Sequence, residues 1–232
     1  MQAVILAGGK GTRLLPLTKN IPKPLVPIGE RAILEIILIQ LKKSGFKKIV
    51  IAVNHLSHLI KSHFGNGEKL GLSITYSEEK KPLGTAGPLS IINNLEENFL
   101  VMNGDILSNL NFKKLFNYHL KKKSLITIST YMKNLPINLG VVEFNKGKFI
   151  NYFEKPNYNF KVSMGIYIMN IKVLELIKKN QYCDLPNLII NANKKKRIIN
   201  EYYENCEWLD IGRHEDYEYA KKIFKKNIKK FI

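Results

Sequence analysis

The sequence predicts an α/β fold, with a mainly parallel sheet covered by helices on both faces and a small mixed-sheet region added in the second half. Three observations predict it. Short, wholly apolar segments of strand length, such as 3–6 and 49–53, are typical of strands buried on both faces. Segments with apolar residues at helical spacing alternate with them, and this alternation is typical of parallel sheets. After residue 125, strand-like segments become more frequent than helical ones.

The first half of the chain supplies the parallel part of this sheet. Residues 32–43 place four apolar side chains on one helical face, and Gly45 is expected to end that helix. A long loop rich in Gly, Pro and Lys follows the first strand. In chain order we expect strands over 3–6, 49–53, 72–76 and 99–102, and helices over 32–43, 55–64 and 85–93.

The second half supplies the mixed-sheet region and the last helices. Tyr217, Ala220, Phe224, Ile228 and Phe231 form one face of the final amphipathic segment, which we expect to pack on its own domain rather than on a membrane surface. The whole chain is expected to be one domain, 1–232, divided into a core (1–124), a second part (125–213) and a C-terminal helix (214–232). Further strands are expected over 125–132, 141–144, 149–153 and 162–169, and helices near Ile171 and Leu185.

The net charge of +18 is the most unusual feature of the composition. Of 37 basic residues only four are arginines, namely Arg13, Arg31, Arg197 and Arg213. Base-edge readout of nucleic acids relies heavily on arginine, and the chain shows no interleaving of aromatic and basic residues. We therefore expect a lysine-rich solvated surface, no nucleic-acid partner, and some electrostatic benefit for phosphorylated ligands.

Targeting signals are not apparent in the sequence. The N-terminus has a short apolar run and no preceding basic region, and no stretch of eighteen apolar residues follows. Two cysteines, Cys183 and Cys206, cannot build a disulfide framework. We expect reduced thiols, no transmembrane segment and a cytoplasmic location.

A glycine-rich loop follows the first strand directly. It reads Leu6-Ala-Gly-Gly-Lys-Gly-Thr-Arg-Leu14, so its glycines can turn tightly and expose N–H groups to an anion. It lacks the Gly-Lys-Ser/Thr of a Walker-A loop, and Leu14 replaces the third glycine of a dinucleotide fingerprint. Next comes Pro22-Lys-Pro-Leu-Val-Pro27, where two prolines hold Lys23 in a defined direction.

Together these two segments resemble the start of the sugar-1-phosphate nucleotidyltransferases, a family that includes mannose-1-phosphate guanylyltransferases and glucose-1-phosphate thymidylyltransferases. The resemblance covers residues 3–212 in family order. It implies a Rossmann-like, mainly nucleotide-binding core (1–124) and a sugar-phosphate-binding part that carries the second metal aspartate (125–213). The later segments that carry it are Pro82-Leu-Gly-Thr-Ala-Gly87, Asn103-Gly104-Asp105, Glu154-Lys155-Pro156, Gly165-Ile-Tyr167 and Trp208-Leu-Asp-Ile-Gly212.

The resemblance also implies roles for individual residues. Arg13 and Lys23 are the expected catalytic cations, and Asp105 and Asp210 are the expected ligands of Mg²⁺. The nucleoside triphosphate is expected at Leu6, Ala7, Gly8, Gly9, Lys10, Gly11, Thr12, Gly84, Thr85, Ala86 and Gly87. The sugar 1-phosphate is expected at Gly140, Glu154, Lys155, Ser163 and Gly165. A homo-oligomer is a further expectation from the family.

These residue types suit transfer of a nucleotidyl group between two polyanions. Lysine, arginine and a divalent cation offset the repulsion of the phosphates, and Mg²⁺ prefers one or two carboxylates plus phosphate oxygens. A phosphate monoester is already an anionic nucleophile, so no general base is needed. The Pro-Lys-Pro form of the second segment resembles that of guanylyltransferases, and this resemblance implies GTP. Ser163 stands where relatives often have Asn, which leaves the sugar open.

The sequence is also compatible with other functions, and single residues allow other interpretations. The acceptor could be choline phosphate or another small phosphate ester, or the protein could bind nucleotide sugars without turning them over. Taken singly, Asp105 could be a turn residue and Asp210 a helix cap. Glu78 and Glu79 are interpreted as solvated loop residues, and Trp208 as a packing residue.

Overall fold

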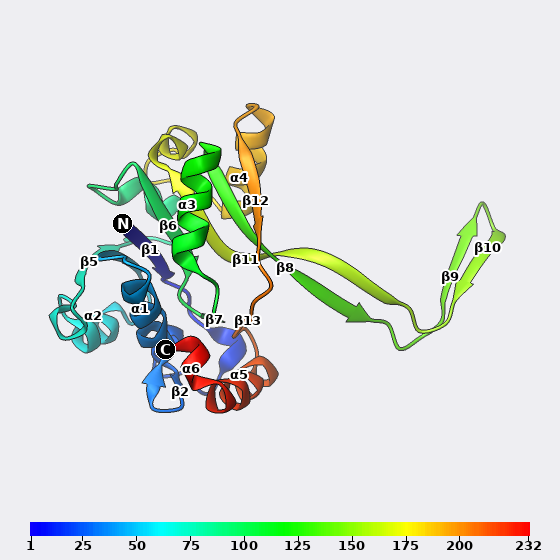
Figure 1. The fold of residues 1–232 in the computed structure, drawn as a ribbon, viewed down its shortest axis with the longest axis horizontal. Coiled ribbons are helices and arrows are strands. Elements are labelled where there is room, and N and C mark those ends of the chain that lie inside the picture. Colours follow the sequence, from blue (N-terminus) through cyan, green and yellow to red (C-terminus); the bar gives the residue numbers. More distant parts are fainter.

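A seven-stranded sheet forms the centre of the molecule in the computed structural model, which describes residues 1–232 (Figure 1). The strand order is β12-β8-β11-β6-β1-β4-β5. β11 is antiparallel to both of its neighbours, and every other neighbouring pair is parallel. The strands are β1 (Gln2–Ala7), β4 (Lys48–Val53), β5 (Ser73–Glu78), β6 (Asn98–Asn103), β8 (Ile126–Pro136), β11 (Asn157–Asn170) and β12 (Ile199–Tyr203). The predicted fold class is confirmed.

Helices cover both faces of this sheet, because alternate residues of its strands point into two separate cores. Ala3 and Ile5 of β1 belong to the larger core, and Val4 belongs to the smaller one. The larger core lies under α1 (Ile33–Lys43), α2 (Ser57–Phe64), α3 (Phe112–Lys122) and α5 (His214–Lys226). The smaller core lies under η4 (Gly87–Ile91), η5 (Ile171–Leu176) and α4 (Leu185–Lys194).

The order of the strands creates a crevice beside β1. From β1 the chain passes to β4 and β5 on one side, and then returns to β6 on the other side. In open α/β sheets ligands bind beyond the carboxyl ends of strands where the order reverses in this way. Residues 7–10 and 103–105 follow β1 and β6, and the Gly104 N–H donates to the Leu6 carbonyl at 2.9 Å. The fold therefore places both predicted phosphate and metal segments at one edge.

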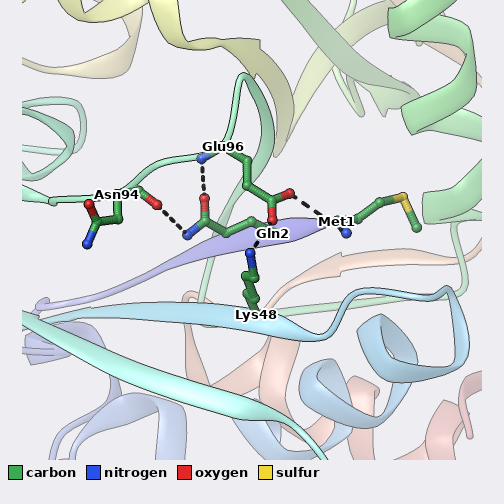
Figure 2. Close-up of polar contacts among 5 residues, drawn as sticks. All are labelled: Met1, Gln2, Lys48, Asn94 and Glu96. Atoms are coloured by element: carbon green, nitrogen blue, oxygen red, sulfur yellow. Dashed lines mark hydrogen bonds and ion pairs between the residues drawn. The ribbon is translucent and has the colours of Figure 1, made fainter.

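The start of β1 is fastened to two neighbouring segments by Gln2 and Glu96 (Figure 2). The Gln2 amide accepts from the Glu96 N–H at 2.6 Å and donates to the Asn94 carbonyl at 3.3 Å. The Glu96 carboxylate lies 2.9 Å from Lys48 Nζ and 3.8 Å from the N-terminal ammonium of Met1. These contacts hold β1 in register between β4 and β6 at the end opposite the crevice.

The helix over residues 32–43 is confirmed as α1, and its end follows from Gly45. The Phe46 N–H donates to the Leu41 carbonyl and the Gly45 N–H to the Lys42 carbonyl, which together make a Schellman motif. Gly45 has φ of +88°, a conformation that glycine adopts without strain.

Three other helix predictions need correction. Residues 85–93 contain only the 3₁₀ turn η4. This turn begins at Gly87 and Pro88, and a proline at this point prevents an α-helix from running through the whole segment. The helix near Ile171 is likewise the 3₁₀ turn η5. The final segment breaks at Asn227 into α5 and α6 (Ile228–Phe231), which leaves Ile228 exposed, whereas Tyr217, Ala220, Phe224 and Phe231 pack on the domain as predicted. No helix combines the length and apolar composition needed to cross a bilayer.

The second half extends the central sheet and then leaves it as a long arm (Figure 1). β8 and β11 pair beside β6, continue past the sheet edge, and carry the hairpin of β9 (Val141–Asn145) and β10 (Lys148–Phe153) at their tip. Two further small antiparallel pairs complete the fold: β2 (Pro27–Ile28) with β3 (Arg31–Ala32), and β7 (Ile106–Ser108) with β13 (Trp208–Asp210). Short 3₁₀ turns are η1 (Thr12–Leu14), η2 (Lys23–Leu25) and η3 (Glu68–Leu70).

A buried histidine makes the stability of this fold depend on pH. His119 is 1% exposed, with Nδ1 2.8 Å from the Thr127 hydroxyl and Nε2 3.1 Å from Asn98 Oδ1. Burial lowers the pKa of His119 from 6.5 to about 4. The unfolded chain takes up a proton near pH 6.5 and the folded chain only near pH 4, so acidification through this window favours unfolding, by up to about 3 kcal/mol.

Urea unfolding between pH 7 and 4.5 measures this effect. The free energy of unfolding of the unmodified chain is expected to fall more steeply with acidification than that of His119→Gln, which is less stable at pH 7 but lacks the titrating group. His58→Gln, at an exposed position of α2, is the matched control and keeps the steep slope. Parallel slopes for His119→Gln and the unmodified chain would contradict the assignment.

Candidate active site

A cleft of about 440 Å³ opens at the carboxyl ends of β1 and β6. Nine residues predicted to bind phosphate, nucleoside or metal line it: Leu6, Ala7, Gly8, Gly9, Lys10, Lys23, Gly84, Thr85 and Asp105. Its other walls come from Pro24, Ala52, Asn54, Glu79, Pro82, Pro88, Asn103, Gly104 and Tyr182. Segments that are far apart in the sequence therefore meet in one cavity with the composition of a phosphate site.

The glycine-rich loop connects β1 to η1 along the floor of the cleft. Gly11 has φ of +64°, and a Cβ there would lie 3.0 Å from Thr18 and 3.1 Å from Lys23. The buried Thr18 hydroxyl donates to the Gly11 carbonyl at 2.7 Å and so fixes the turn. Thr12 and Arg13 follow in η1, whose Leu14 side chain is fully buried. This anchoring presents Arg13 at a fixed point beside the cleft.

Lys23 lies at the start of η2 and points into the cleft. Pro22 and Pro24 flank it, and the Val26 N–H donates to the Lys23 carbonyl at 3.1 Å, so the turn is rigid. Its side chain is only 10% exposed, and its ammonium forms an ion pair with Asp105 Oδ2. A nearly buried cation beside a glycine-rich loop is suited to contact a reacting phosphate.

The two predicted metal aspartates come from strands that pair with each other. Asp105 precedes β7 and Asp210 ends β13, and the Ile211 N–H donates to the Asp105 carbonyl at 3.1 Å. Although Asp210 keeps solvent access, partial burial and the nearby charge of Asp105 raise the pKa of its carboxyl, against the opposing effects of Lys23 and Arg13. The aspartate motif at 208–212 therefore belongs to the same site, and Asp210 does not cap α5, whose N-cap residue is Arg213.

The aspartate pair fits a hard divalent cation. Asp105 Oδ1 is buried and has no hydrogen-bond partner, and the mutual repulsion of the two carboxylates favours a neighbouring positive charge. Mg²⁺ commonly takes one or two carboxylates and completes its shell with phosphate oxygens and water. No group of three or more His, Cys, Asp or Glu side chains forms a protein-only metal cage, so substrate oxygens would have to supply the remaining ligands.

Asp184 holds the loop over residues 82–87 in place, and the sequence analysis missed it. Its Oδ1 accepts from the Thr85 N–H at 3.1 Å and the Thr85 hydroxyl at 3.2 Å, and its Oδ2 accepts from Tyr182 at 2.6 Å. Ala86 and Gly87 donate N–H groups to the Cys183 carbonyl, which would lie 2.6 Å from a Cβ at Gly84. Asp184 stands at the N-terminus of α4, a signal for a helix cap, but its carboxylate bonds to the loop instead.

The interpretation of Glu78 and Glu79 as solvated residues is right for one of them. Glu78 is exposed and bonds to Ser57 and Lys61 outside the cleft. Glu79 lines the cleft, accepts from the Leu83 N–H at 2.8 Å, and has its pKa raised by burial. Trp208 is a packing residue as predicted, because it packs against the larger core and its ring lies 5.2 Å from that of Tyr131. Its indole N–H donates to the Met164 carbonyl at 2.9 Å.

The predicted sugar-phosphate residues are divided between two places. A Cβ at Gly165 would lie 2.7 Å from the amide of Asn103, which lines the cleft, and the Gly165 N–H lies 3.3 Å from the Ser163 hydroxyl. Gly140, Glu154 and Lys155 instead lie on the arm with the β9–β10 hairpin, away from the cleft (Figure 1). Glu154 and Lys155 are both exposed and lie 3.9 Å from each other.

Comparison with known proteins places these features in a family. The family model described as nucleotidyl transferase matches residues 2–227. A UTP–glucose-1-phosphate uridylyltransferase from Synechocystis is 34% identical over 94% of this chain and 61% of its own length. A mannose-1-phosphate guanylyltransferase catalytic subunit beta from Dictyostelium discoideum is 33% identical over 94% of this chain and 62% of its own.

The fold is also shared with solved structures. HddC from Yersinia pseudotuberculosis superposes with a TM-score of 0.76 at 25% identity, covering 96% of this chain and 99% of the other. The chain spans about three fifths of the length of the curated relatives described above. On the match over residues 2–227, this chain belongs to the nucleotidyl transferase family.

Proposed function

We propose that the protein transfers a nucleotidyl group from a nucleoside triphosphate to a sugar 1-phosphate, giving a nucleotide sugar and pyrophosphate. The observation that carries the proposal is the nearly buried Lys23–Asp105 pair beside the glycine-rich loop, with Asp210 on the adjoining strand. Both relatives described above are named as sugar-1-phosphate nucleotidyltransferases, which supports the substrate class.

The proposed reaction is a direct in-line displacement. An oxygen of the sugar phosphate attacks the α-phosphorus of the triphosphate, the bond from that phosphorus to the bridging oxygen breaks, and pyrophosphate leaves with the electron pair. Backbone N–H groups of Gly8, Gly9 and Gly11 bind the triphosphate with Lys10 nearby, and Arg13 and Lys23 offset the charge that develops during transfer. Mg²⁺ held by Asp105 and Asp210 would supply further charge neutralisation and orient the phosphates.

The nucleoside and the acceptor are proposed at opposite sides of this phosphate site. Gly84, Thr85, Ala86 and Gly87 carry the backbone close to the base and ribose, and Ser163 and Gly165 lie on the acceptor side. GTP is the favoured nucleotide because the Pro-Lys-Pro segment has the guanylyltransferase form and several relatives carry that name. We place the reaction in the cytoplasm, in the synthesis of glycan or surface-polysaccharide precursors, and retain the division into 1–124, 125–213 and 214–232.

Pyrophosphate release tests this proposal. Four nucleoside triphosphates are crossed with a panel of sugar 1-phosphates, with choline phosphate included, in the presence of Mg²⁺. We expect turnover with GTP and one sugar 1-phosphate, and loss of that turnover with EDTA that excess Mg²⁺ reverses. Turnover confined to choline phosphate would favour a different acceptor class. Tight triphosphate binding with no turnover in any combination would indicate a binding protein.

Asp184→Ala is expected to raise KM for the triphosphate by about tenfold or more with a smaller effect on kcat, because it removes three hydrogen bonds that hold Tyr182 and Thr85. Tyr182→Phe removes only one of these bonds and is the matched control, with an expected change in KM of a few fold at most. Steady-state kinetics at saturating acceptor give both constants. An unchanged KM in Asp184→Ala would show that the loop keeps its conformation without this carboxylate.

A further inference from the structure

A second pocket, of about 710 Å³, lies at the end of the central sheet opposite the cleft. Asn98 begins β6 and lines this pocket, whereas Asn103 ends β6 and lines the cleft. The five steps along the strand between these two residues correspond to roughly 17 Å. None of the residues that line the cleft also lines this pocket. It is therefore a separate site, with a volume in the range of small-molecule sites.

Four cations from three separate segments converge on the rim of this pocket. They follow α3, lie in η5 and connect α4 with β12, and they are Lys123, Lys172, Lys196 and Arg197. Only the arginine forms an ion pair, with Glu175 at 3.4 Å, so the three lysines have no carboxylate partner. Glu97 is the one carboxylate in the lining, which leaves the lining with a net charge of +3. A recess with this charge concentrates small anions.

Two of the rim lysines are placed by the ends of helices. Lys123 is the C-cap of α3 with φ of +50°, and Lys196 lies just beyond α4 with φ of +53°. Their backbone N–H groups donate to the Leu120 and Asn193 carbonyls at 3.2 and 2.9 Å, respectively. Glycine or asparagine is usual at such positions, because most side chains raise the energy of the left-handed conformation. Both lysines can therefore be replaced by asparagine without disturbing the backbone.

The floor of the pocket is a hydrogen-bonded network whose direction one backbone donor fixes. The Lys172 N–H donates to Asn170 Oδ1 at 3.1 Å, so Asn170 Nδ2 is the group that donates to Asn98 Oδ1 at 3.1 Å. Because this amide oxygen can only accept, the His119 Nε2–H also donates to it, at 3.1 Å. His119 Nδ1 then accepts from the Thr127 hydroxyl at 2.8 Å. The amide oxygens and the imidazole are thus engaged within the chain.

The side chains of this floor offer a ligand only donors. Asn98 Nδ2 donates to no group of the chain. The Ser124 hydroxyl accepts from Asn200 Nδ2 at 2.6 Å, and its own hydrogen has no acceptor within the chain. Ionised phosphate oxygens accept hydrogen bonds, and charge-assisted bonds to them are strong. Two neutral donors below four rim cations therefore match a phosphate group.

We propose that this pocket binds a small phosphate ester that carries hydroxyl groups. Its phosphate lies between the rim cations and the donors of Asn98 and Ser124. Glu97 in the same lining disfavours a second anionic group and can accept from hydroxyls, so the rest of the ligand is uncharged and polar. The site does not depend on the proposed nucleotidyl transfer, because its residues are distinct from those of the cleft.

The ring signals of His119 in a ¹H–¹³C spectrum report binding at this pocket, since His119 lines it. His119→Gln assigns them by their loss. Ribose 5-phosphate and inorganic phosphate are the probes, at constant ionic strength and with EDTA. We expect both to shift the His119 signals saturably, the ester at a concentration about tenfold lower or less because its hydroxyls add contacts. His58, exposed on α2, should not shift saturably. Equal half-saturating concentrations would overturn the assignment to an ester, and no saturable shift would overturn the site.

Two double variants separate the pocket from general surface charge. Lys123→Asn/Lys196→Asn should raise the half-saturating concentration of ribose 5-phosphate by about tenfold or more, with no fall in melting temperature. Lys178→Asn/Lys179→Asn removes the same charge from exposed positions outside the pocket, and it should change that concentration by about twofold at most. Equal weakening in both double variants would overturn the proposal, because the attraction would then belong to the whole surface.

Lys23→Ala separates this pocket from the cleft. It removes a cation of the cleft, so the shift of the His119 signals should keep its half-saturating concentration to within about twofold. Loss of the shift in this variant would overturn the proposal, since the signals would then report a ligand bound in the cleft. Retention of the shift would support the second site whether or not the chain turns over nucleotides.

Discussion

Asp105→Asn is expected to lower kcat for nucleotidyl transfer by about a hundredfold or more, and to weaken activation by Mg²⁺. Asp105 contributes one of the two carboxylates at the site, and its buried Oδ1 has no protein partner that could substitute for a cation. Losing this charge weakens binding of the divalent cation. It also leaves the nearly buried ammonium of Lys23 without its counterion. Removal of one preorganised electrostatic group commonly costs on the order of a hundredfold to a thousandfold in kcat.

Three measurements distinguish this effect from unfolding. Asparagine keeps the size and one oxygen of the side chain, so far-UV circular dichroism should be unchanged and the melting temperature only modestly lower. A Mg²⁺ titration of the residual activity should show a higher half-saturating concentration. Glu30→Gln, at an exposed carboxylate outside the cleft, is the matched control and should behave as the unmodified enzyme. A near-normal kcat in Asp105→Asn at low Mg²⁺ would remove this residue from the proposed metal site.

Arg13→Ala is expected to lower kcat by about a hundredfold with an unchanged melting temperature. The guanidinium lies on the Asp210 side of the cleft, since a Cβ built on Gly212 would lie 3.5 Å from it and 3.7 Å from the Asp210 carboxylate. Arg13 itself is exposed and held in place by the buried Leu14, so its removal should not disturb the core. A donor that stabilises charge only during transfer is worth roughly 2.7–4 kcal/mol.

Two further variants sharpen this expectation. Arg13→Lys should recover part of the lost rate, because lysine keeps the charge but lacks the planar fork that binds two phosphate oxygens together. Lys19→Ala removes an exposed cation from the same loop and should leave kcat within a few fold of the unmodified value. A purified Arg13→Ala enzyme with near-normal turnover would exclude the assigned role.

Local signals were enough to predict the sheet, α1 and the glycine-rich segment that lines the cleft. Buried strands and the segment ending at Gly45 have patterns confined to a few neighbouring residues, and these patterns survive in the fold. The helix expected over 85–93 was wrong because the Gly87-Pro88 pair favours a turn at this point of the chain. The spacing of Ile228 in the sequence places it on the apolar face of one continuous helix. In the structure the helix breaks at Asn227, so Ile228 no longer lies on that face.

Contacts between distant segments could not be predicted in the same way. Asp184 is about a hundred residues from Thr85, and its position before Leu185 and Pro186 equally well indicates an ordinary helix start. The strands of the arm were predicted, but their apolar residues have the composition of a buried hairpin, whereas the structure leaves them exposed. The sequence pattern indicates that an apolar surface should be covered, but it does not indicate which segment or molecule covers it.

The pairing of β7 with β13 has a consequence for the order in which the site is completed during synthesis. Chains fold from the N-terminus as they emerge from the ribosome. The glycine-rich loop, Lys23 and Asp105 all precede residue 106, whereas Asp210 joins them only when β13 has paired with β7. A nascent chain could thus acquire a surface that attracts phosphates long before it acquires the second carboxylate. The second carboxylate would then join the site only after residue 210 has emerged, which separates folding of the first strands from completion of the aspartate pair.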